Sequence, residues 1–388
     1  MANLKSIDAA FGQAVESKAM PGIVAMAATD ERVVYEGAFG KRELGKDAAM
    51  TLDTVVWIAS MTKAITATAA MQLVEQGKLA LDRPASETVP ELGSAKVLDG
   101  FDAAGQPRLR PATRPITLRH LLTHTAGFAY EIWEPSIAQY QEATGTPGIT
   151  TCANAALTTP LLFDPGDRWD YGINIDWVGK MVEAVSGQKL DRYFQDHIFG
   201  PLGMKDTAFK IGPAQRVRLA KIHQRDDKGA LAPVDLEIPQ DPEFHMGGGG
   251  LYGTAGDYLT FALMIMQGGS LKGAQVLRPE TAALMAENHI GALEIGAFKT
   301  AIPPLSNDLE LFPGMSKKWG LSFLITTQTA PTGRSAGSLA WAGLANTYFW
   351  IDRTRRVSGV FLSQVLPFYD HTAIDLFGKF ETEVYRAI

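Results

Sequence analysis

Cysteine is nearly absent from this sequence of 388 residues, in which Cys152 is the single copy. One thiol cannot form an intrachain disulfide, and a structural zinc site would find no set of thiols to use. This cysteine content fits a reducing compartment, so we expect a cytoplasmic protein.

Long hydrophobic runs and an excess of positive charge are also missing. The longest apolar candidate, Phe261 to Met266, is far too short to span a membrane. The start, Met1 to Ala19, has charged residues between its apolar ones and lacks the apolar core of a secretory signal peptide. Lys and Arg number 36 against 42 Asp and Glu, which leaves a net charge of −6 and no basic stretch. We therefore expect no nucleic-acid and no membrane partner, while the oligomeric state stays open.

The proportions of hydrophobic and charged residues, 46% and 20%, are those of a globular protein. Runs typical of β-strands lie near the two ends, at Gly22–Thr29, Arg32–Phe39, Ser338–Ala342, Thr347–Asp352 and Val357–Gln364. Amphipathic helices are expected over Met1–Ala19 and Thr372–Tyr385. The middle consists mostly of helical fragments and Gly/Pro loops, with helices from about Thr117 and over Trp177–Ser186. These patterns predict an α/β fold. Residues 1–84 and 314–388 would form one discontinuous domain, an antiparallel sheet flanked by helices, and residues 85–313 an inserted, mainly helical domain.

A single lysine interrupts the otherwise apolar first part of a helix that we expect to begin at Ser60 and end at Gly77. Lys63 lies one turn after Ser60, so its amine can reach the serine hydroxyl. The positive first turn of a helix disfavours an ammonium and favours a developing alkoxide. A lysine that is partly neutral can accept the serine proton, which an exposed lysine with a pKa of about 10.4 cannot do. The spacing predicts Ser60 as a nucleophile, and the alternative is an ordinary N-cap serine.

Other motifs are weaker. Ser186-Gly-Gln-Lys189 repeats the S-x-x-K spacing but is typical of a solvated helix end. His120 and His124 have the spacing of two zinc ligands, yet the glutamate of the zinc motif and an obvious third ligand are missing. The run Gly247–Gly250 is not followed by the residues of a phosphate loop, so tight packing near a cleft is the better interpretation. No G-x-S-x-G occurs, which disfavours an α/β-hydrolase. We expect no metal and no organic cofactor.

Five short motifs occur in an order that matches a known superfamily. They are Ser60-Met-Thr-Lys63, Gly77-Lys-Leu-Ala-Leu-Asp-Arg-Pro84, Leu121-Leu-Thr-His-Thr-Ala-Gly127, Pro165-Gly-Asp-Arg-Trp-Asp-Tyr171 and Gly248-Gly-Gly-Leu-Tyr-Gly-Thr254. Together they resemble the serine hydrolases of the class C β-lactamase fold. Through Trp341-Ala-Gly343, which precedes the strand-like run Thr347–Asp352, the chain is most similar to the family VIII carboxylesterases and the related lovastatin-type acyltransferases. The resemblance implies an active site in the cleft between the two domains.

The resemblance also implies a second catalytic group, Tyr171, whose phenol could pass a proton between Ser60 and the leaving group. Ile173 stands where a β-lactamase has asparagine, and Asn174 comes one residue late, so this position lacks the amide that contacts a β-lactam side chain in the β-lactamases. A core tyrosine with a satisfied hydroxyl is the alternative for Tyr171.

Trp341-Ala342-Gly343 stands where the β-lactamases have K-T-G, and an indole in place of an ammonium supplies an apolar wall. That exchange favours neutral esters, although Trp341 could also be an ordinary buried tryptophan. By the resemblance, the N–H groups of Ser60 and Leu344 form the oxyanion hole, and Gly343 allows close approach of the backbone. Phe128, Trp169 and Trp133 belong either to an acyl pocket or to the core.

These observations favour a serine carboxylesterase that hydrolyses neutral small-molecule esters, short-chain or aryl, through an acyl-enzyme on Ser60. An acyltransferase or a weak β-lactam hydrolase would use the same site. A non-catalytic binding or sensor protein of the same fold is the alternative of another class.

Overall fold

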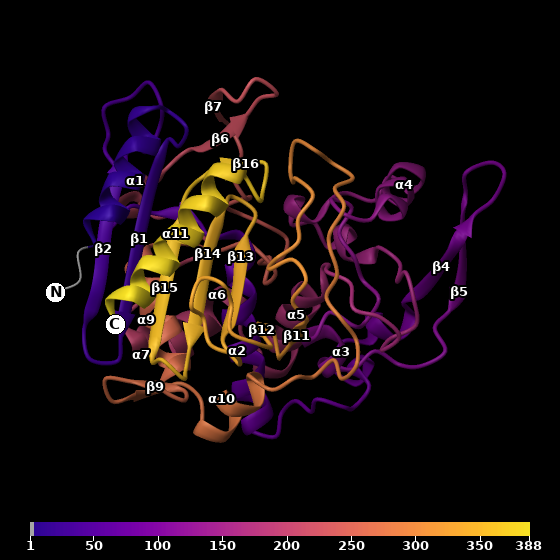
Figure 1. Cartoon of the computed structure of the whole chain (residues 1–388). Helices are drawn as coiled ribbons and strands as arrows, with labels where there is room; N and C mark the ends of the chain where they lie inside the picture. Colours follow the sequence, from indigo (N-terminus) through magenta and orange to yellow (C-terminus); the bar gives the residue numbers. More distant parts are fainter. Residues whose placement is uncertain (1–3) are drawn as a thin grey trace.

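The computed structural model describes residues 4–388, so residues 1–3 of the first predicted helix lie outside the described part. Its centre is a seven-stranded antiparallel sheet in the order β11-β12-β13-β14-β15-β1-β2. The strands are β1 (Gly22–Thr29), β2 (Val33–Gly40), β11 (Lys317–Trp319), β12 (Leu324–Thr326), β13 (Leu339–Gly343), β14 (Thr347–Asp352) and β15 (Val357–Leu362). The pairing of β1 with β15 joins the two ends of the chain in one sheet (Figure 1). This architecture confirms the predicted fold class.

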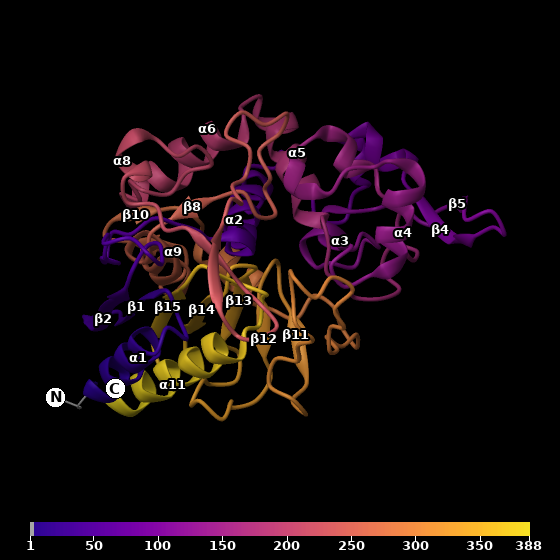
Figure 2. The ribbon, with the colours of Figure 1, turned by 90° about the horizontal axis from the view of Figure 1, so that it is seen from above.

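Helices cover both faces of the sheet, as the view from above shows (Figure 2). On one face lie α1 (Lys5–Glu16) and α11 (His371–Ala387), and on the other α9 (Ala255–Met266) packs against β1, β14 and β15. Side chains along β14 alternate accordingly: Tyr348 and Trp350 join the core under α1 and α11, whereas Phe349 and Ile351 join the core under α9. Burial on both faces explains why the strand is a continuous apolar run.

Most of the remaining helices lie on the side of the sheet that α9 covers, farther from the strands than α9 (Figure 2). Helix α2 (Thr62–Glu75) packs against α5 (Asn174–Ser186), which also contacts α3 (Leu118–Leu122) and α6 (Leu190–Phe194). Helix α4 (Pro135–Thr144) lies in the same part of the molecule (Figure 2). The hairpin of β4 (Lys96–Phe101) and β5 (Pro107–Pro111) projects from this region (Figures 1 and 2). Helix α9 lies within residues 85–313 in sequence but packs on the sheet. The proposed domain boundaries therefore stay a prediction.

Short elements complete the fold. They are β3 (Val56–Trp57), which pairs with β8 (Tyr252–Gly253), the sheet of β6 (Ile222–Arg225), β7 (Leu231–Val234) and β16 (Val365–Leu366), the pair β9 (Ser270–Leu271) and β10 (Ala274–Gln275), and the helices α7 (Gly200–Leu202), α8 (Pro213–Arg216) and α10 (Pro279–Met285). Within residues 4–388, no helix combines the length and apolar character needed to cross a membrane.

Candidate active site

The predicted nucleophile lies on a tight turn. Ser60 is the middle residue of a 3₁₀ turn, Ala59–Met61, and α2 begins only at Thr62, two residues later than the predicted helix start. The preceding Ala59 is buried and has φ +44°, a left-handed conformation that is unfavourable for a residue with a Cβ. This turn separates Ser60 from the regular helix, and the Ser60 side chain lines a cleft.

Lys63 is completely buried, and its amine contacts three oxygen atoms. Its Nζ donates to Ser60 Oγ at 3.2 Å, to the hydroxyl of Tyr130 at 3.0 Å and to the carbonyl oxygen of Gly248 at 2.6 Å. The carbonyl can only accept a hydrogen bond, whereas both hydroxyls can donate or accept. A neutral amine can therefore keep all three contacts by donating to Gly248 and accepting the Ser60 proton. No side chain has to move when this proton is transferred.

Burial is also the reason why the Lys63 amine loses its proton readily. Removal from water disfavours the ammonium and lowers the pKa of Lys63 to about 7, and the nearby Asp176 opposes this shift only in part. At neutral pH a substantial fraction of Lys63 is then an amine that can act as a base.

Asp176 is a buried carboxylate directly behind the lysine. Its Oδ1 accepts a hydrogen bond from the N–H of Gly248 at 2.8 Å, and the carbonyl oxygen of the same glycine accepts the hydrogen bond from the Lys63 amine. Burial raises the pKa of Asp176, and the charge of Lys63 partly offsets this increase. A Cβ on Gly248 would come within 2.5 Å of Asp176 Oδ2, so a glycine is required for this approach. Asp176 thus fixes the backbone that holds the lysine.

The glycine run that the sequence singled out is a packing surface for α2 and the turn before it. Three successive carbonyls, of Gly247, Gly248 and Gly249, accept hydrogen bonds from Thr66 Oγ1, Lys63 Nζ and Trp57 Nε1. This supports the interpretation of the run as tight packing next to the cleft.

Tyr171 lies beside Lys63 and is held by Trp341. Its hydroxyl accepts the indole N–H of Trp341 at 2.9 Å, and the Lys63 amine lies 4.7 Å from the centre of its ring. Burial raises the pKa of Tyr171, although hydrogen bonds with the Ser60 side chain and Trp341 act in the opposite direction. At neutral pH the phenol is therefore protonated and can donate a proton. Trp341 does more than form an apolar wall, because its N–H orients this phenol.

His124 packs against the other side of Tyr171 as a neutral imidazole. The ring centres are 4.7 Å apart, and burial together with Lys63 places the pKa of His124 well below its usual value. Asn174 Nδ2 lies 3.0 Å from His124 Nδ1 and also donates to the carbonyl of Phe128 at 3.1 Å. The amide nitrogen of Asn174 is thus engaged with His124 and Phe128, and Asn174 is not among the residues of the cleft.

The cleft at Ser60 is narrow and apolar. It has a volume of about 30 Å³, and its lining consists of Ser60, Trp133, Tyr171, Phe298, Leu309, Leu311, Trp341, Ala342, Gly343, Leu344 and Phe368. Such a volume holds roughly two water molecules. None of these lining residues carries a charge, so the cleft suits a neutral substrate.

Ser60 and Leu344, whose N–H groups the resemblance assigns to the oxyanion hole, both belong to segments at the cleft. Ser60 is near the start of its turn, where N–H groups lack partners within the helix, and Leu344 follows β13 directly. The approach of β13 is close: a Cβ on Gly343 would lie 2.3 Å from the carbonyl oxygen of Ile58. Both Ser60 and Leu344 line the cleft, where their amides could hold an oxyanion.

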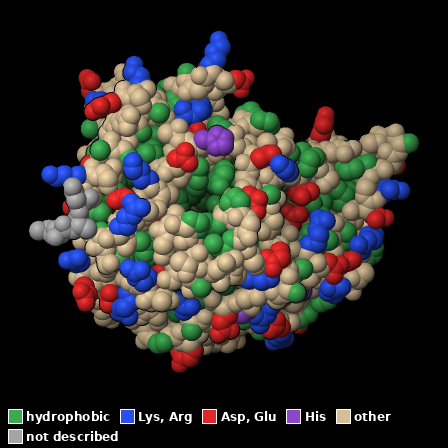
Figure 3. Space-filling view, viewed as in Figure 1, with side chains coloured by type: hydrophobic (Ala, Val, Ile, Leu, Met, Phe, Trp, Pro, Cys, Tyr) green, Lys and Arg blue, Asp and Glu red, His purple; other side chains and the backbone are tan. Residues whose placement is uncertain are grey.

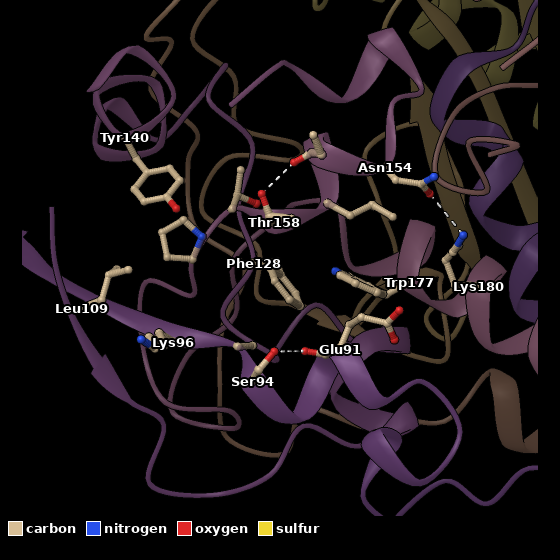
Figure 4. Close-up of a pocket in the computed structure, with 15 residues that line it drawn as sticks. Glu91, Ser94, Lys96, Leu109, Phe128, Tyr140, Asn154, Thr158, Trp177 and Lys180 are labelled. Atoms are coloured by element: carbon tan, nitrogen blue, oxygen red, sulfur yellow. Dashed lines mark hydrogen bonds between the residues drawn. The ribbon is translucent and has the colours of Figure 1, made fainter. Parts of the chain in front are cut away.

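Two of the predicted pocket residues, Phe128 and Trp169, do not line this cleft. Asn174 fixes the Phe128 carbonyl, and the Phe128 ring stacks on Trp177 with centres 6.2 Å apart, in a separate cavity of about 760 Å³ (Figure 4). Trp169 is half-buried behind Tyr171, with ring centres 6.3 Å apart, and is likewise not part of the cleft lining. Trp133 does line the cleft.

The weaker motifs have structural roles. Ser186 Oγ donates to the Val182 carbonyl in the last turn of α5, and the Lys189 side chain is 68% exposed. His120 caps its own helix through Thr117, and His124 belongs to the core. Within the described part of the chain, no group of three His, Cys, Asp or Glu side chains could hold a metal ion.

The sequence analysis missed two residues next to Lys63. In the sequence, the only sign that Tyr130 belongs to the site is its position shortly after the Leu121–Gly127 motif. For Asp176 the only such sign is its position five residues after Tyr171. Both are far from Lys63 in the chain, so their proximity became visible only in the structure.

The chain belongs to the beta-lactamase family, whose model matches residues 7–378. It is 33% identical over 394 residues to a lovastatin esterase from Penicillium rubens, covering 98% of each chain. It is 31% identical over 399 residues to a monacolin J acid methylbutanoyltransferase from Aspergillus terreus, covering 98% of this chain and 95% of the relative. A mutant of simvastatin synthase from Aspergillus terreus has a similar structure, with a TM-score of 0.87, 31% identity and coverage of 99% and 96%. These relatives confirm the resemblance to serine hydrolases of this fold and to lovastatin-type enzymes.

Proposed function

We propose that this protein is a serine carboxylesterase, of the family VIII type, that acylates Ser60 with neutral ester substrates. The observation that carries the proposal is the buried Lys63 amine, 3.2 Å from Ser60 Oγ and partly uncharged at neutral pH. The lovastatin esterase among the relatives supports the same reaction class.

In the proposed reaction, Ser60 Oγ attacks the ester carbonyl while Lys63 takes the hydroxyl proton. The raised pKa of Tyr171 favours Lys63 as the base and Tyr171 as the proton donor to the departing alcohol. The proton held by Lys63 then returns to the Tyr171 phenolate, which leaves the amine neutral for the attack of water. The N–H groups of Ser60 and Leu344 would stabilise the tetrahedral oxyanion. Water then attacks the acyl-enzyme and releases the acid.

Acyl transfer to an alcohol is a second candidate, because the cleft is apolar and one relative is a methylbutanoyltransferase. A β-lactamase activity has less support, since Asn174 is engaged away from the cleft and Trp341 replaces the cation of K-T-G.

The test is a panel of p-nitrophenyl esters with and without an added alcohol, together with a chromogenic cephalosporin. Hydrolysis supports the esterase, and a new ester as the main product supports the transferase. A fluorophosphonate probe followed by peptide mapping distinguishes both from a non-catalytic protein, in which Ser60 would stay unlabelled.

Asp176→Asn should shift the acidic limb of the pH profile of kcat/KM to lower pH. The carboxylate raises the pKa of Lys63, so its removal lowers that pKa further and leaves the amine neutral in more acidic solution. Lys63 faces Tyr130, Tyr171, His124 and Asp176, and only Asp176 changes in the variant. A lower plateau with an unmoved limb would assign Asp176 a structural role alone.

A further inference from the structure

A second cavity adjoins the catalytic cleft along β13. It has a volume of about 270 Å³, against about 30 Å³ for the cleft, and the two share Leu311, Trp341 and Ala342 as lining residues. The cavity lies between the edge of the sheet and α11, and its walls include Phe312, Met315, Tyr348, Ile374 and Phe377. The space-filling view shows a hollow with hydrophobic side chains beside α11 (Figure 3).

We propose that this cavity binds the aliphatic acyl chain of the substrate, so that the enzyme accepts esters of branched or medium-length acids rather than acetyl esters alone. The inference rests on the proposed function. The cleft holds roughly two water molecules and cannot enclose a longer acyl chain by itself. This cavity shares a wall with the cleft, whereas three other cavities of the described residues share no lining residue with it.

The direction of the ester in the cleft supports the acyl chain as the occupant. The leaving alcohol must lie near Tyr171 and Lys63, because these groups supply its proton. Neither residue lines the cavity, whereas Ala342 next to the proposed oxyanion hole does. The substituent on the other side of the carbonyl therefore points towards the cavity.

The two spaces meet at a part of β13 that β12 does not cover. Strand β12 pairs with β13 only at Leu339 and Ala340, so Trp341 to Gly343 have no neighbouring strand on that side. Ala342 has a small side chain at the point where the cleft and the cavity meet.

The charges in the cavity neutralise each other. Arg334 and Glu381 are 2% and 1% exposed and form two hydrogen bonds, of 2.6 and 2.8 Å. Among the described residues that line the cavity, no unpaired cation is left to attract an anionic ligand, and the paired charges favour an uncharged chain.

Gly378 on α11 offers a direct test. It lines the cavity, and a Cβ at this position would have no atom within 4 Å. The Cβ of Gly378→Leu therefore meets no atom, its side chain should occupy part of the cavity, and leucine also suits a helix better than glycine does. Gly12→Leu on α1 is the matched control, because Gly12 is also helical, half-buried and free of atoms within 4 Å of an added Cβ.

The experiment compares kcat/KM for p-nitrophenyl acetate and p-nitrophenyl octanoate in wild type, Gly378→Ala, Gly378→Leu and Gly12→Leu. We expect Gly378→Leu to lose the octanoate reaction at least about tenfold with the acetate reaction unchanged, and Gly378→Ala to lose less. Equal effects on both esters, or no effect, would overturn the acyl-chain assignment while the esterase function stands. Absence of turnover of both esters in the wild type would instead overturn the proposed function. If Gly378→Leu does not fold, the octanoate-to-acetate ratio of Gly378→Ala decides: a reduced ratio supports the assignment and an unchanged ratio overturns it.

Discussion

Replacement of Ser60 by alanine should abolish ester hydrolysis, with a loss of roughly 10⁴-fold or more in kcat. Of the two hydroxyls hydrogen-bonded to the buried Lys63 amine among the residues that the structure describes, that of Ser60 is the one that lines the cleft. Tyr130, the other hydroxyl bonded to that amine, does not line the cleft. The measurement is the initial rate with a p-nitrophenyl ester, combined with labelling by a fluorophosphonate.

The matched control is Ser186→Ala, which removes the serine of the second S-x-x-K match. Ser186 Oγ bonds the Val182 carbonyl at a helix end, so this variant should keep wild-type rates. Thermal unfolding of both variants checks that the fold is intact. Turnover by folded Ser60→Ala at a rate near that of the wild type would rule out the acyl-enzyme mechanism.

Strands buried on both faces were the most predictable part of the fold. The predicted runs Gly22–Thr29 and Thr347–Asp352 coincide with β1 and β14, because burial on two faces demands a continuous apolar sequence with clear polar limits. The predicted run Val357–Gln364 continued two residues beyond β15, since Ser363 and Gln364 are buried through hydrogen bonds rather than strand pairing. The start of α2 was less predictable, because the left-handed Ala59 has no signature in the sequence.

The site was predictable only where its residues are close in sequence or belong to a motif. The spacing of Ser60 and Lys63 specified their contact, since residues three positions apart share a face of a helix. Tyr171 and Trp341 entered through the resemblance, and their mutual hydrogen bond joins residues 170 positions apart. Tyr130 and Gly248 approach Lys63 from 67 and 185 positions away. Such contacts depend on the packing of α2 against loops, which periodicity does not encode.

Trp341 and Asn174 illustrate why a motif position alone does not define a role. The indole was expected as an apolar wall, but its N–H bonds the Tyr171 hydroxyl, so one side chain both closes the cleft and orients a proton donor. Asn174, one position from its place in the β-lactamase pattern, supports the backbone at Phe128 instead of facing the cleft. One residue of displacement on a helix turns a side chain by about 100°, which is sufficient to exchange these functions.

Replacement of Lys63 by methionine should lower kcat by on the order of 10²-fold or more, because the serine then loses its base. Methionine is flexible and apolar and can occupy the buried space, so the loss would report the amine rather than a cavity. The wild-type rate should fall as the pH decreases through about 7, where Lys63 gains its proton, and the residual rate of the variant should lack this step. The measurement is kcat/KM against pH for both proteins.

The pH dependence of kcat/KM distinguishes a Lys63 that acts as a base from a Lys63 that only supplies a positive charge. If an ammonium at position 63 only attracted the substrate, activity would increase as the pH falls and the charge becomes complete. The buried amine predicts the opposite sign, since only its neutral form can accept the Ser60 proton while it donates to Gly248. Lys189→Met, at an exposed lysine of the second S-x-x-K match, should change neither the rate nor its pH dependence. A wild-type profile that rises towards acid, or a Lys63→Met variant with an unchanged profile, would exclude Lys63 as the base and leave Ser60 to be activated by the Tyr171 phenol.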